Sequence, residues 1–412
     1  MESEEHYDWL RPPPRNLWTL PRSIVNSLRS VRDRVLALVG VKSSRQTVTI
    51  EHALRTDGVR GYSYLQPLNF VTSINASTFL TDIIKTHAFQ RLASVRFLGG
   101  IDYVLVRSPN GNTKNVRYTR SQHSLGVARL ALHYATTTSM QEEEARTIFV
   151  AALLHDVGHA PFSHSLEPVF ECEFGINHHK ATEDVICGRT QIGRDLSHIL
   201  MQNHVDIDRV IALLNGSDTG FNGFFSGPIN FDTIEGISRC RMYGRNDGST
   251  SNPSIIVDAA TKRVGGVDCD IVDGFWNQKN EVYKYIIGSR TNVLADCACQ
   301  QYMRNNLTKF SKEDYYSTEE AAFRKLPGLY QLLTSRSFEL DVWHLVKNAI
   351  EYSARTFYVD AGYDFFARDD LRRYKQFRES HVLEARAIDI DAAKSMKDLF
   401  DDHAVSEGQT VF

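Results

Sequence analysis

The segment AALLHDVGHAPFSHSLE, residues 151–167, constrains this 412-residue chain more than any other stretch. His155 and Asp156 follow directly after four apolar residues, and His159 and His164 come soon afterwards. Imidazole and carboxylate groups bind divalent cations and also transfer protons near neutral pH. An ordinary amphipathic helix has no need of so many of them together. We therefore expect a fold that presents this segment.

Two predicted helices lead into the segment from its N-terminal side. Residues 122–135 have apolar residues at helical spacing, which places His123 at the start of the first helix. The acidic run at 142–144 opens the second helix, and a glycine and a proline end it just beyond His155 and Asp156. This pair is thus expected in a last helical turn, where free carbonyl groups and the negative end of the helix dipole favour a cation.

The rest of the chain predicts a mostly α fold with small β-hairpins. An Asn-Gly turn between β-rich runs predicts one hairpin over residues 102–118, and paired glycines between short β-rich pieces predict another around residues 255–272. A loop rich in Gly, Ser and Asn at residues 215–227 leads into a helix that begins near Asp232. From residue 280 onward the pattern is helical, with a polar tail.

Composition divides the chain into three parts. Residues 1–45 form an N-terminal arm and a basic amphipathic helix at 23–39, residues 46–310 form the main domain, and residues 311–412 form a C-terminal helical region. A basic amphipathic helix can lie on an anionic membrane. Packing on the protein's own body or on a partner subunit is the commoner arrangement, and we expect it here.

Composition also excludes several classes of protein. A hydrophobic fraction of 42% is typical of a globular chain, and a formal net charge of -3 argues against a strongly cationic nucleic-acid binder. No uninterrupted apolar run could span a bilayer, and the start of the chain is acidic and polar where a signal peptide would be apolar. We expect a cytoplasmic protein without a membrane or nucleic-acid partner, although these numbers leave an oligonucleotide substrate open.

Four residues from separated segments have the donor types of one divalent-metal site. They are His123, His155, Asp156 and Asp232, and their nitrogen and oxygen donors suit Mn²⁺, Mg²⁺, Fe²⁺, Zn²⁺ or Ni²⁺ without selecting among them. Each has a plainer interpretation alone, because a histidine at a helix start is usually a surface or capping residue and an aspartate there is usually an N-cap. The joint order of histidine, histidine–aspartate and aspartate favours the metal site.

The motif RSQHSLGVARLA followed by AALLHDVGHAPFSH resembles the HD-domain metal-dependent phosphohydrolases. Within them it is most similar to the deoxynucleoside triphosphate triphosphohydrolases, the dGTPase-like family. HAFQRLASVRFLGG is similar to that family's FQRL…QLGG helix, GPINFDTIEGISRC to its fourth-ligand helix, and IIGSRTNV to a His-Thr-Arg-Asn segment. The resemblance covers residues 79–299. It implies an HD-domain helical fold, a divalent metal ion, a nucleotide substrate and a homo-oligomer.

The resemblance also implies roles for individual side chains. The family's metal ligands match the four residues given above. Its catalytic histidines and their acidic partner match His159, His164, Glu167 and His178. Of these, His164 matches the group that protonates the leaving oxygen, with His178 as the second choice. The arginines that bind the triphosphate match Arg120 and Arg290, for which an ordinary surface ion pair is the alternative.

The chain departs from the family where the sugar and base are recognised. Gly236 replaces the tyrosine that stacks on the sugar, and Cys240 replaces the acid that reads a sugar hydroxyl. The other replaced positions are Phe97, His179, Thr233, Ala298 and Cys299. Buried polar groups of this kind can supply several orders of magnitude of discrimination. Specificity for deoxynucleotides therefore does not follow from the motif.

These observations lead to three hypotheses. The first is metal-dependent hydrolysis of (deoxy)nucleoside triphosphates to nucleoside and triphosphate. The second is an HD phosphodiesterase acting on cyclic nucleotides, oligonucleotides or alarmones. The chain keeps the residues that match the family's metal and phosphate ligands, but it lacks the residues that recognise the sugar and the base. The third is a non-catalytic nucleotide-sensing HD protein, against which the retained His159, His164 and Glu167 weigh.

Overall fold

The computed structural model describes residues 76–105, 118–243, 252–262, 267–345, 349–363 and 373–384. All of them belong to the unit Val59–Phe412. The predicted arm and amphipathic helix of residues 1–45 lie outside the described residues, as do residues 106–117 of the first predicted hairpin.

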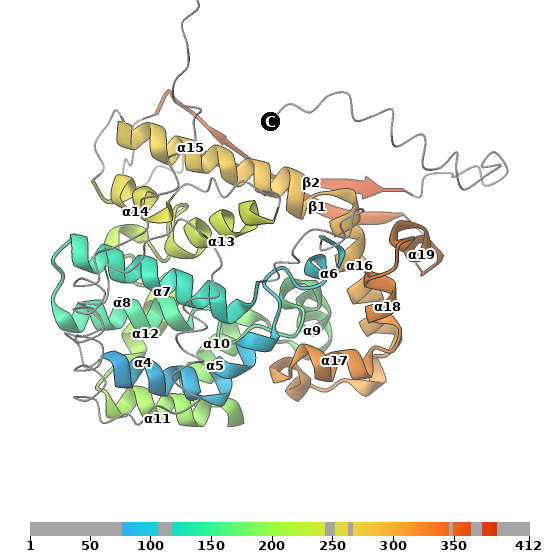
Figure 1. Ribbon diagram of the computed structural model, residues 1–412, viewed down its shortest axis with the longest axis horizontal. Coiled ribbons are helices and arrows are strands. Elements are labelled where there is room, and N and C mark those ends of the chain that lie inside the picture. The colour runs from blue at the N-terminus through green and yellow to red at the C-terminus, as the bar shows by residue number, and fades with distance from the viewer. Residues whose placement is uncertain are drawn as a thin grey trace, which may run out of the picture. The chain divides into compact units, whose positions relative to one another are not determined.

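Within these ranges the fold is helical, with one two-stranded antiparallel sheet (Figure 1). The mostly α class predicted from the sequence is confirmed. The helices are α4 (Ala76–Lys85), α5 (His87–Arg91), α6 (Ile101–Leu105), α7 (Arg120–Thr137), α8 (Glu142–Leu154), α9 (Glu167–Phe174), α10 (His178–Ile186), α11 (Arg194–Gln202), α12 (Ile207–Leu214), α13 (Phe231–Met242), α14 (Pro253–Lys262), α15 (Val267–Val282), α16 (Arg290–Asn305), α17 (Glu319–Lys325), α18 (Leu329–Leu333) and α19 (Phe338–Leu345). The strands are β1 (Ile350–Val359) and β2 (Tyr374–Leu383).

Helices α7 and α8 pack against each other and begin where their sequences predict. Thr119 and Gln122 form a capping box at the start of α7, in which each side chain accepts a hydrogen bond from the other residue's backbone N–H. Helix α8 ends at Leu154, so His155 is its C-cap. Because α8 is buried on nearly every side from Ala145 onward, its sequence is apolar without a polar stripe.

Two hydrophobic clusters meet at the histidine-rich segment. The first is built around α7, α8 and α13–α15 and includes Val157, whereas the second contains residues of α9 and α16–α18 and includes Ala160 and Phe162. The segment therefore passes from one core to the other, and both cores fix its backbone. The second cluster extends from Tyr103 to Ile350 and so contains residues from both sides of the predicted boundary at residue 310. The division into three domains stays a prediction.

The positions of the predicted hairpins are wrong. Helix α6 covers residues 101–105, where a strand was expected, and α14 and α15 cover most of the second hairpin. In α15 the buried residues Val272, Phe275, Trp276 and Lys279 recur at helical spacing. Short β-branched segments around residues 255–272 have a local preference for strands. Burial of one face of a helix outweighs this preference.

The sheet occurs in a region that was expected to be helical. Its ten-residue strands pair from Ile350 with Leu383 to Val359 with Tyr374. Phe357 and Tyr374 cover Trp276 of α15, at ring-centroid distances of 5.4 and 5.2 Å. The hairpin is therefore held by one buried face against a helix that is distant in sequence.

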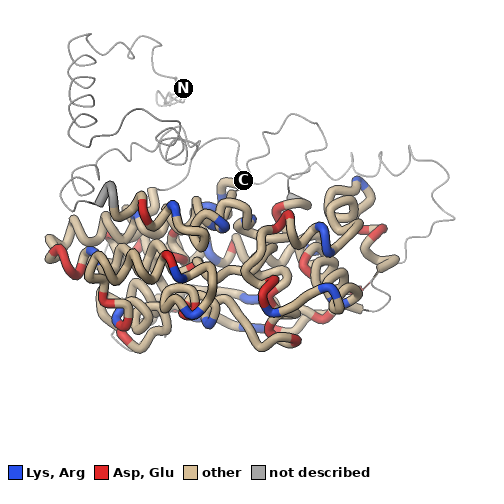
Figure 2. The backbone as a smooth tube through the Cα atoms, turned by 90° about the horizontal axis from the view of Figure 1, so that it is seen from below, with Lys and Arg blue, Asp and Glu red and all other residues tan. Residues whose placement is uncertain are grey.

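Lysine and arginine residues are interspersed with aspartate and glutamate along the described backbone (Figure 2). This distribution agrees with the small net charge of the whole chain. Among the described helices, none has both the length and the apolar character needed to cross a bilayer.

Candidate active site

Three helix ends bring the four predicted metal ligands together. His123 lies in the first turn of α7, and His155 and Asp156 follow the last residue of α8. Asp232 lies in the first turn of α13, which Asn230 caps. The Nε2 atom of His123 lies 3.2 Å from Nε2 of His155 and 3.0 Å from Oδ1 of Asp232. Separate helices, rather than one peptide, thus set the geometry.

A buried carboxylate orients His123. The Nδ1 atom of His123 lies 2.5 Å from Oε2 of Glu235, so Nδ1 donates to the carboxylate and Nε2 faces the other candidate ligands. Arg239 holds Glu235 through Nε, 2.9 Å from Oε1, and through Nη2. Sequence reasoning missed both residues as parts of the site. Their spacing at i+3 and i+7 from Asp232, on the same helical face, was the available signal.

His155 is oriented by the backbone. Its Nδ1 atom lies 2.9 Å from the carbonyl oxygen of Ala152, which can only accept, so Nδ1 donates and Nε2 faces Nε2 of His123. Carboxylate oxygens of Asp156 and Asp232 lie 3.4 and 3.7 Å from Nε2 of His155. Two imidazole nitrogens and two carboxylates directed at one space form a donor set that fits a divalent metal ion, whose binding displaces protons from the nitrogens.

The electrostatics of the site also favour a cation. Burial disfavours a charged ring at His123, but the neighbouring carboxylates, foremost Glu235, raise the pKa of His123 to about 9. Burial likewise disfavours a charged Asp156, but the charges of His155 and Arg120 hold its pKa well below the usual range. The site therefore keeps its carboxylates ionised and attracts positive charge.

Arg120, predicted to bind phosphate, lies beside the candidate metal ligands. Its Nη1 donates to Oδ2 of Asp156 at 2.7 Å, and its Nε donates to Oγ of Ser163 at 2.9 Å. The guanidinium lies 5.1 Å from the centroid of the Phe97 ring. Within the described part of the chain, these contacts leave Nη2 without an acceptor. Ser163 was not identified from the sequence as a positioning residue.

The three predicted catalytic histidines form a second cluster. The ring of His159 stacks on that of His178 at 4.6 Å and meets the edge of His164 at 4.7 Å. Glu167 links the other two, because its carboxylate oxygens lie 2.5 Å from Nδ1 of His178 and 2.9 Å from Nδ1 of His164. Nε2 of His159 lies 3.1 Å from Oδ1 of Asp156, which connects the cluster to the candidate metal ligands.

Glu167 sets the protonation pattern of this cluster. Burial would raise the pKa of Glu167, but its hydrogen bonds to His164 and His178 hold that pKa below the usual range. An ionised carboxylate only accepts, so Nδ1 of each histidine donates to it. The His164 side chain is 60% exposed and thus accessible to a ligand, whereas His159 is buried.

The turn that carries His164 is supported from distant parts of the chain. Phe162 and Ser163 have φ values of 60° and 49°, in the left-handed region. Glu319 of α17 accepts a hydrogen bond from Phe162 N at 3.2 Å. At Gly99 a Cβ atom would lie 2.0 Å from the carbonyl oxygen of Phe162, so only glycine permits this approach. The sequence gave no indication of the contribution of Glu319.

Arg290, the second arginine predicted to bind phosphate, makes its contacts elsewhere. Its Nε atom lies 3.5 Å from Oε2 of Glu339, and its Nη2 donates to the carbonyl oxygen of Glu384 at 3.2 Å. Its guanidinium lies 5.4 Å from the Trp343 ring centroid. In the described ranges no contact joins it to the histidines. Its role in phosphate binding stays a prediction.

The positions that depart from the family are packed with apolar groups. The ring of Phe97 lies 4.7 Å from that of His123, and a Cβ atom added at Gly236 would be 3.6 Å from Phe97. Cys240 and Cys299 are buried. These side chains offer no strong hydrogen-bonding group to a sugar or a base.

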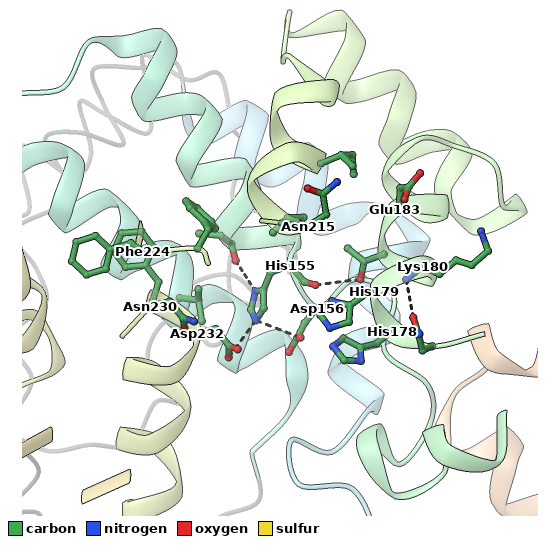
Figure 3. A pocket seen from close by; sticks show the side chains of 18 residues that line it. His155, Asp156, His178, His179, Lys180, Glu183, Asn215, Phe224, Asn230 and Asp232 are labelled. Atoms are coloured by element: carbon green, nitrogen blue, oxygen red, sulfur yellow. Dashed lines mark hydrogen bonds and ion pairs between the residues drawn. The ribbon is translucent and has the colours of Figure 1, made fainter. Parts of the chain in front are cut away.

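A cavity of about 570 Å³ lies beside the candidate ligands (Figure 3). His155, Asp156 and Asp232 lie between a polar side, where α10 contributes His178 and Lys180, and an apolar side. The apolar side is lined by Ile211, Leu214, Phe224, Phe225 and Phe231. The cavity thus brings candidate metal ligands, a candidate catalytic histidine and an apolar wall together.

The fold and the site define a helical protein with a candidate HD-type metal centre, and comparisons agree. Residues 120–260 match the model of the HD domain family. This segment is similar to the HD-domain proteins, and the chain is similar to the deoxynucleoside triphosphate triphosphohydrolases among them. A hypothetical protein from Aquifex aeolicus shares the fold, with a TM-score of 0.53 at 16% identity over 74% of this chain and 91% of that one.

Proteins that match this chain in sequence include some with an assigned activity and some without one. Deoxynucleoside triphosphate triphosphohydrolase SAMHD1 of Gallus gallus is 25% identical over 59% of this chain, and that of Homo sapiens is 33% identical over 28% of it. The uncharacterized protein YwfO of Bacillus subtilis is 32% identical over 32% of the chain. The matches span 36%, 16% and 29% of these relatives' lengths, respectively.

Proposed function

We propose that this protein hydrolyses (deoxy)nucleoside triphosphates to nucleoside and triphosphate in a metal-dependent reaction. One observation carries the proposal: Asp156 belongs to the candidate metal set and also contacts His159 of the histidine cluster, at 3.1 Å. A cation site and a proton-transferring site are therefore adjacent. Hydrolysis of a phosphate ester requires both, together with positive charge on the phosphoryl oxygens.

His123, His155, Asp156 and Asp232 would hold the metal ion. When bound, such an ion lowers the pKa of a coordinated water and neutralises charge on a phosphoryl oxygen. Arg120 would direct its Nη2 to another phosphoryl oxygen, because its remaining donors are held by Asp156 and Ser163.

His164 is our choice for the group that protonates the leaving oxygen. Glu167 accepts from its Nδ1, so Nε2 is the atom that can carry a proton to the substrate. His178 has the same partner and lines the cavity, so it is the alternative donor. The apolar wall of the cavity would accommodate the nucleoside.

The test is incubation of the full chain with Mn²⁺ and a panel of deoxynucleoside and ribonucleoside triphosphates. The expected products are nucleoside and intact triphosphate. Asp156→Ala is expected to abolish turnover, and His164→Ala to lower kcat by about 10²–10⁴-fold with little change in bound metal. Turnover no greater than that of Asp156→Ala protein would refute the proposal.

An HD phosphodiesterase is the second candidate. The observation that favours it is the apolar packing of Phe97, Gly236 and Cys240 at positions where the triphosphohydrolases read the sugar and base. Cyclic nucleotides, oligonucleotides and alarmones would be included in the same panel. Turnover of a diester with triphosphates left intact would establish this candidate instead. A homo-oligomeric state and a cytoplasmic location remain predictions.

A further inference from the structure

One short loop carries part of the apolar wall of the cavity. Residues 221–227 precede α13, and Phe224 and Phe225 of this loop line the cavity together with Asp232. Phe224 is buried and stacks on Phe231, with a centroid distance of 4.6 Å and an interplanar angle of 8°. Phe225 meets the ring of Phe231 edge-on at 5.6 Å and is only partly buried. Among these three rings, Phe225 is therefore the one with surface open to a ligand.

The backbone of this loop is held in an uncommon conformation. Phe221, Asn222 and Gly223 have φ values of 54°, 57° and 73°, so three consecutive residues lie in the left-handed region. For a bulky residue such as phenylalanine this conformation is sterically costly. The loop is tied to the start of α13, because Phe231 N donates to the carbonyl oxygen of Phe224 at 3.0 Å. Backbone strain that is retained in this way is typical of ligand-binding segments.

The two sides of the cavity differ in charge. His178 and Lys180 line the side away from Phe224 (Figure 3). With a metal ion at the candidate ligands, that side attracts the anionic end of a ligand. The opposite wall is apolar and continues from the loop to Ile211 and Leu214 of α12. A ligand complementary to both sides has an anionic end and an uncharged flat or apolar end, as a nucleoside polyphosphate has.

Two asparagines also line the cavity, but their amide oxygens are bonded to the protein's own backbone. Oδ1 of Asn230 accepts from Thr233 N at 2.7 Å, and Nδ2 of Asn230 donates to the carbonyl oxygen of Gly227 at 3.1 Å. Oδ1 of Asn215 accepts from Ser217 N at 2.9 Å. The wall therefore offers mainly ring faces and aliphatic groups. Stacking on a ring is tolerant of the base, because every base has a π face.

We propose that Phe225 stacks on the nucleobase of the substrate and that this wall accepts purines and pyrimidines alike. The proposal rests on the proposed function for the nature of the ligand, and it adds the position of the base. The candidate metal ligands and the α10 side of the cavity then hold the phosphate end. Phe225 is thus a substrate-binding residue that the sequence motif does not contain.

The test is calorimetry on the full chain with Mn²⁺, and the reference is the His164→Ala protein, in which slow turnover allows binding to be measured. The titrants are ATP, dATP, CTP, dCTP and inorganic tripolyphosphate. Adding Phe225→Ala to the reference is expected to weaken binding of adenine and cytosine nucleotides about tenfold each, with tripolyphosphate binding and manganese content unchanged. Adding Phe225→Trp instead is expected to retain nucleotide binding, because the larger ring also stacks.

Phe221→Ala is the matched control, since Phe221 lies in the same loop but does not line the cavity, and its ring centroid is 5.1 Å from the guanidinium of Arg209. It is expected to bind nucleotides like the reference. Unchanged nucleotide binding by Phe225→Ala, an equal loss of tripolyphosphate binding, weakening confined to one base, or an equal effect of Phe221→Ala would each overturn the proposal.

The choice of titrants separates this proposal from the proposed function. Tripolyphosphate binding without nucleotide binding by the reference protein would refute the proposed function, and the stacking role with it. Tight nucleotide binding that does not depend on Phe225 would refute the stacking role alone. Should Phe225→Ala not fold, Phe225→Leu replaces it under the same criteria, since leucine keeps an apolar side chain but lacks the ring.

Discussion

At the scale of single residues, the candidate metal centre depends on partners that are not themselves ligands. Glu235 accepts from Nδ1 of His123, and the Ala152 carbonyl accepts from Nδ1 of His155. Both contacts leave Nε2 as the nitrogen that points into the space shared by the candidate ligands. The candidate ligands are therefore preorganised, so metal binding does not have to supply the free energy of orienting them.

Glu235→Gln is predicted to weaken metal affinity about 10–100-fold. The amide can still accept from His123, but it lacks the negative charge that makes Nε2 a stronger donor to a metal. Metal content after competition with a graded series of chelators measures the effect, and circular dichroism confirms the fold. Glu143→Gln, at an exposed position in the first turn of α8, is the control. Equal metal retention by both variants would contradict this role of Glu235.

The residue scale also shows where sequence reasoning succeeds. His123, His155, Asp156 and Asp232 lie close together, as expected from their residue types, and their role as metal ligands stays a prediction. Glu319 could not be found this way. It reaches the histidine-rich turn only through the tertiary fold, and a glutamate near a helix start is ordinary in a sequence.

At the scale of elements, α17 and the histidine-rich turn are coupled through a titratable group. Glu319 is buried, and burial raises its pKa from 4.5 to about 7. The folded state thus binds this proton more tightly than the unfolded chain. Its contribution to the free energy of unfolding is present at low pH, falls as the pH rises from about 4.5 to about 7, and is level above that.

Glu319→Gln is predicted to remove this pH dependence, which is on the order of 3 kcal/mol for the wild-type protein. Glutamine stays uncharged and can still accept from Phe162 N. Urea unfolding between pH ~5 and ~8 gives the free energy of unfolding of both proteins. Parallel pH profiles for the two proteins would show that Glu319 does not carry the effect.

The absence of a side chain at Gly158 allows the backbone of the histidine-rich segment to approach the backbone of α10 closely. A Cβ atom there would lie 2.1 Å from Thr182 N and 2.5 Å from the carbonyl carbon of Ala181. Gly158→Ala is predicted to displace α10, which carries His178, to destabilise the fold by about 1–3 kcal/mol, and to lower kcat. Gly274→Ala in α15 is the control, because its Cβ meets nothing within 4 Å, and it is predicted to be neutral or stabilising. Wild-type stability and kcat in Gly158→Ala would contradict the account.

Element prediction worked where local signals and burial agree. The apolar spacing of residues 122–135 and the acidic first turn of α8 predicted both helices close to their observed positions. It failed for α15 and for the β1–β2 hairpin. In those cases the deciding interaction is the packing of Phe357 and Tyr374 on Trp276, residues that lie 81 and 98 positions apart in the chain, and no local pattern encodes such contacts.

At the scale of the whole molecule, the candidate metal site joins α7, α8 and α13, so its occupancy should contribute to the stability of the fold. Removing metal with a chelator is predicted to lower Tm, and adding back a divalent ion at about a hundredfold excess over its dissociation constant to restore about 2.7 kcal/mol. Differential scanning fluorimetry of wild-type and Asp232→Ala protein measures this. A response of Asp232→Ala equal to that of the wild type would place the ion elsewhere.

The central claim is that this site directs water to the phosphorus that bears the nucleoside. The most direct measurement is mass spectrometry of the products formed from a nucleoside triphosphate in ¹⁸O-labelled water with Mn²⁺. The account predicts unlabelled nucleoside and an intact triphosphate that carries the label. Nucleoside mono- or diphosphate as the product, labelled nucleoside, or no product above that of Asp156→Ala would contradict it.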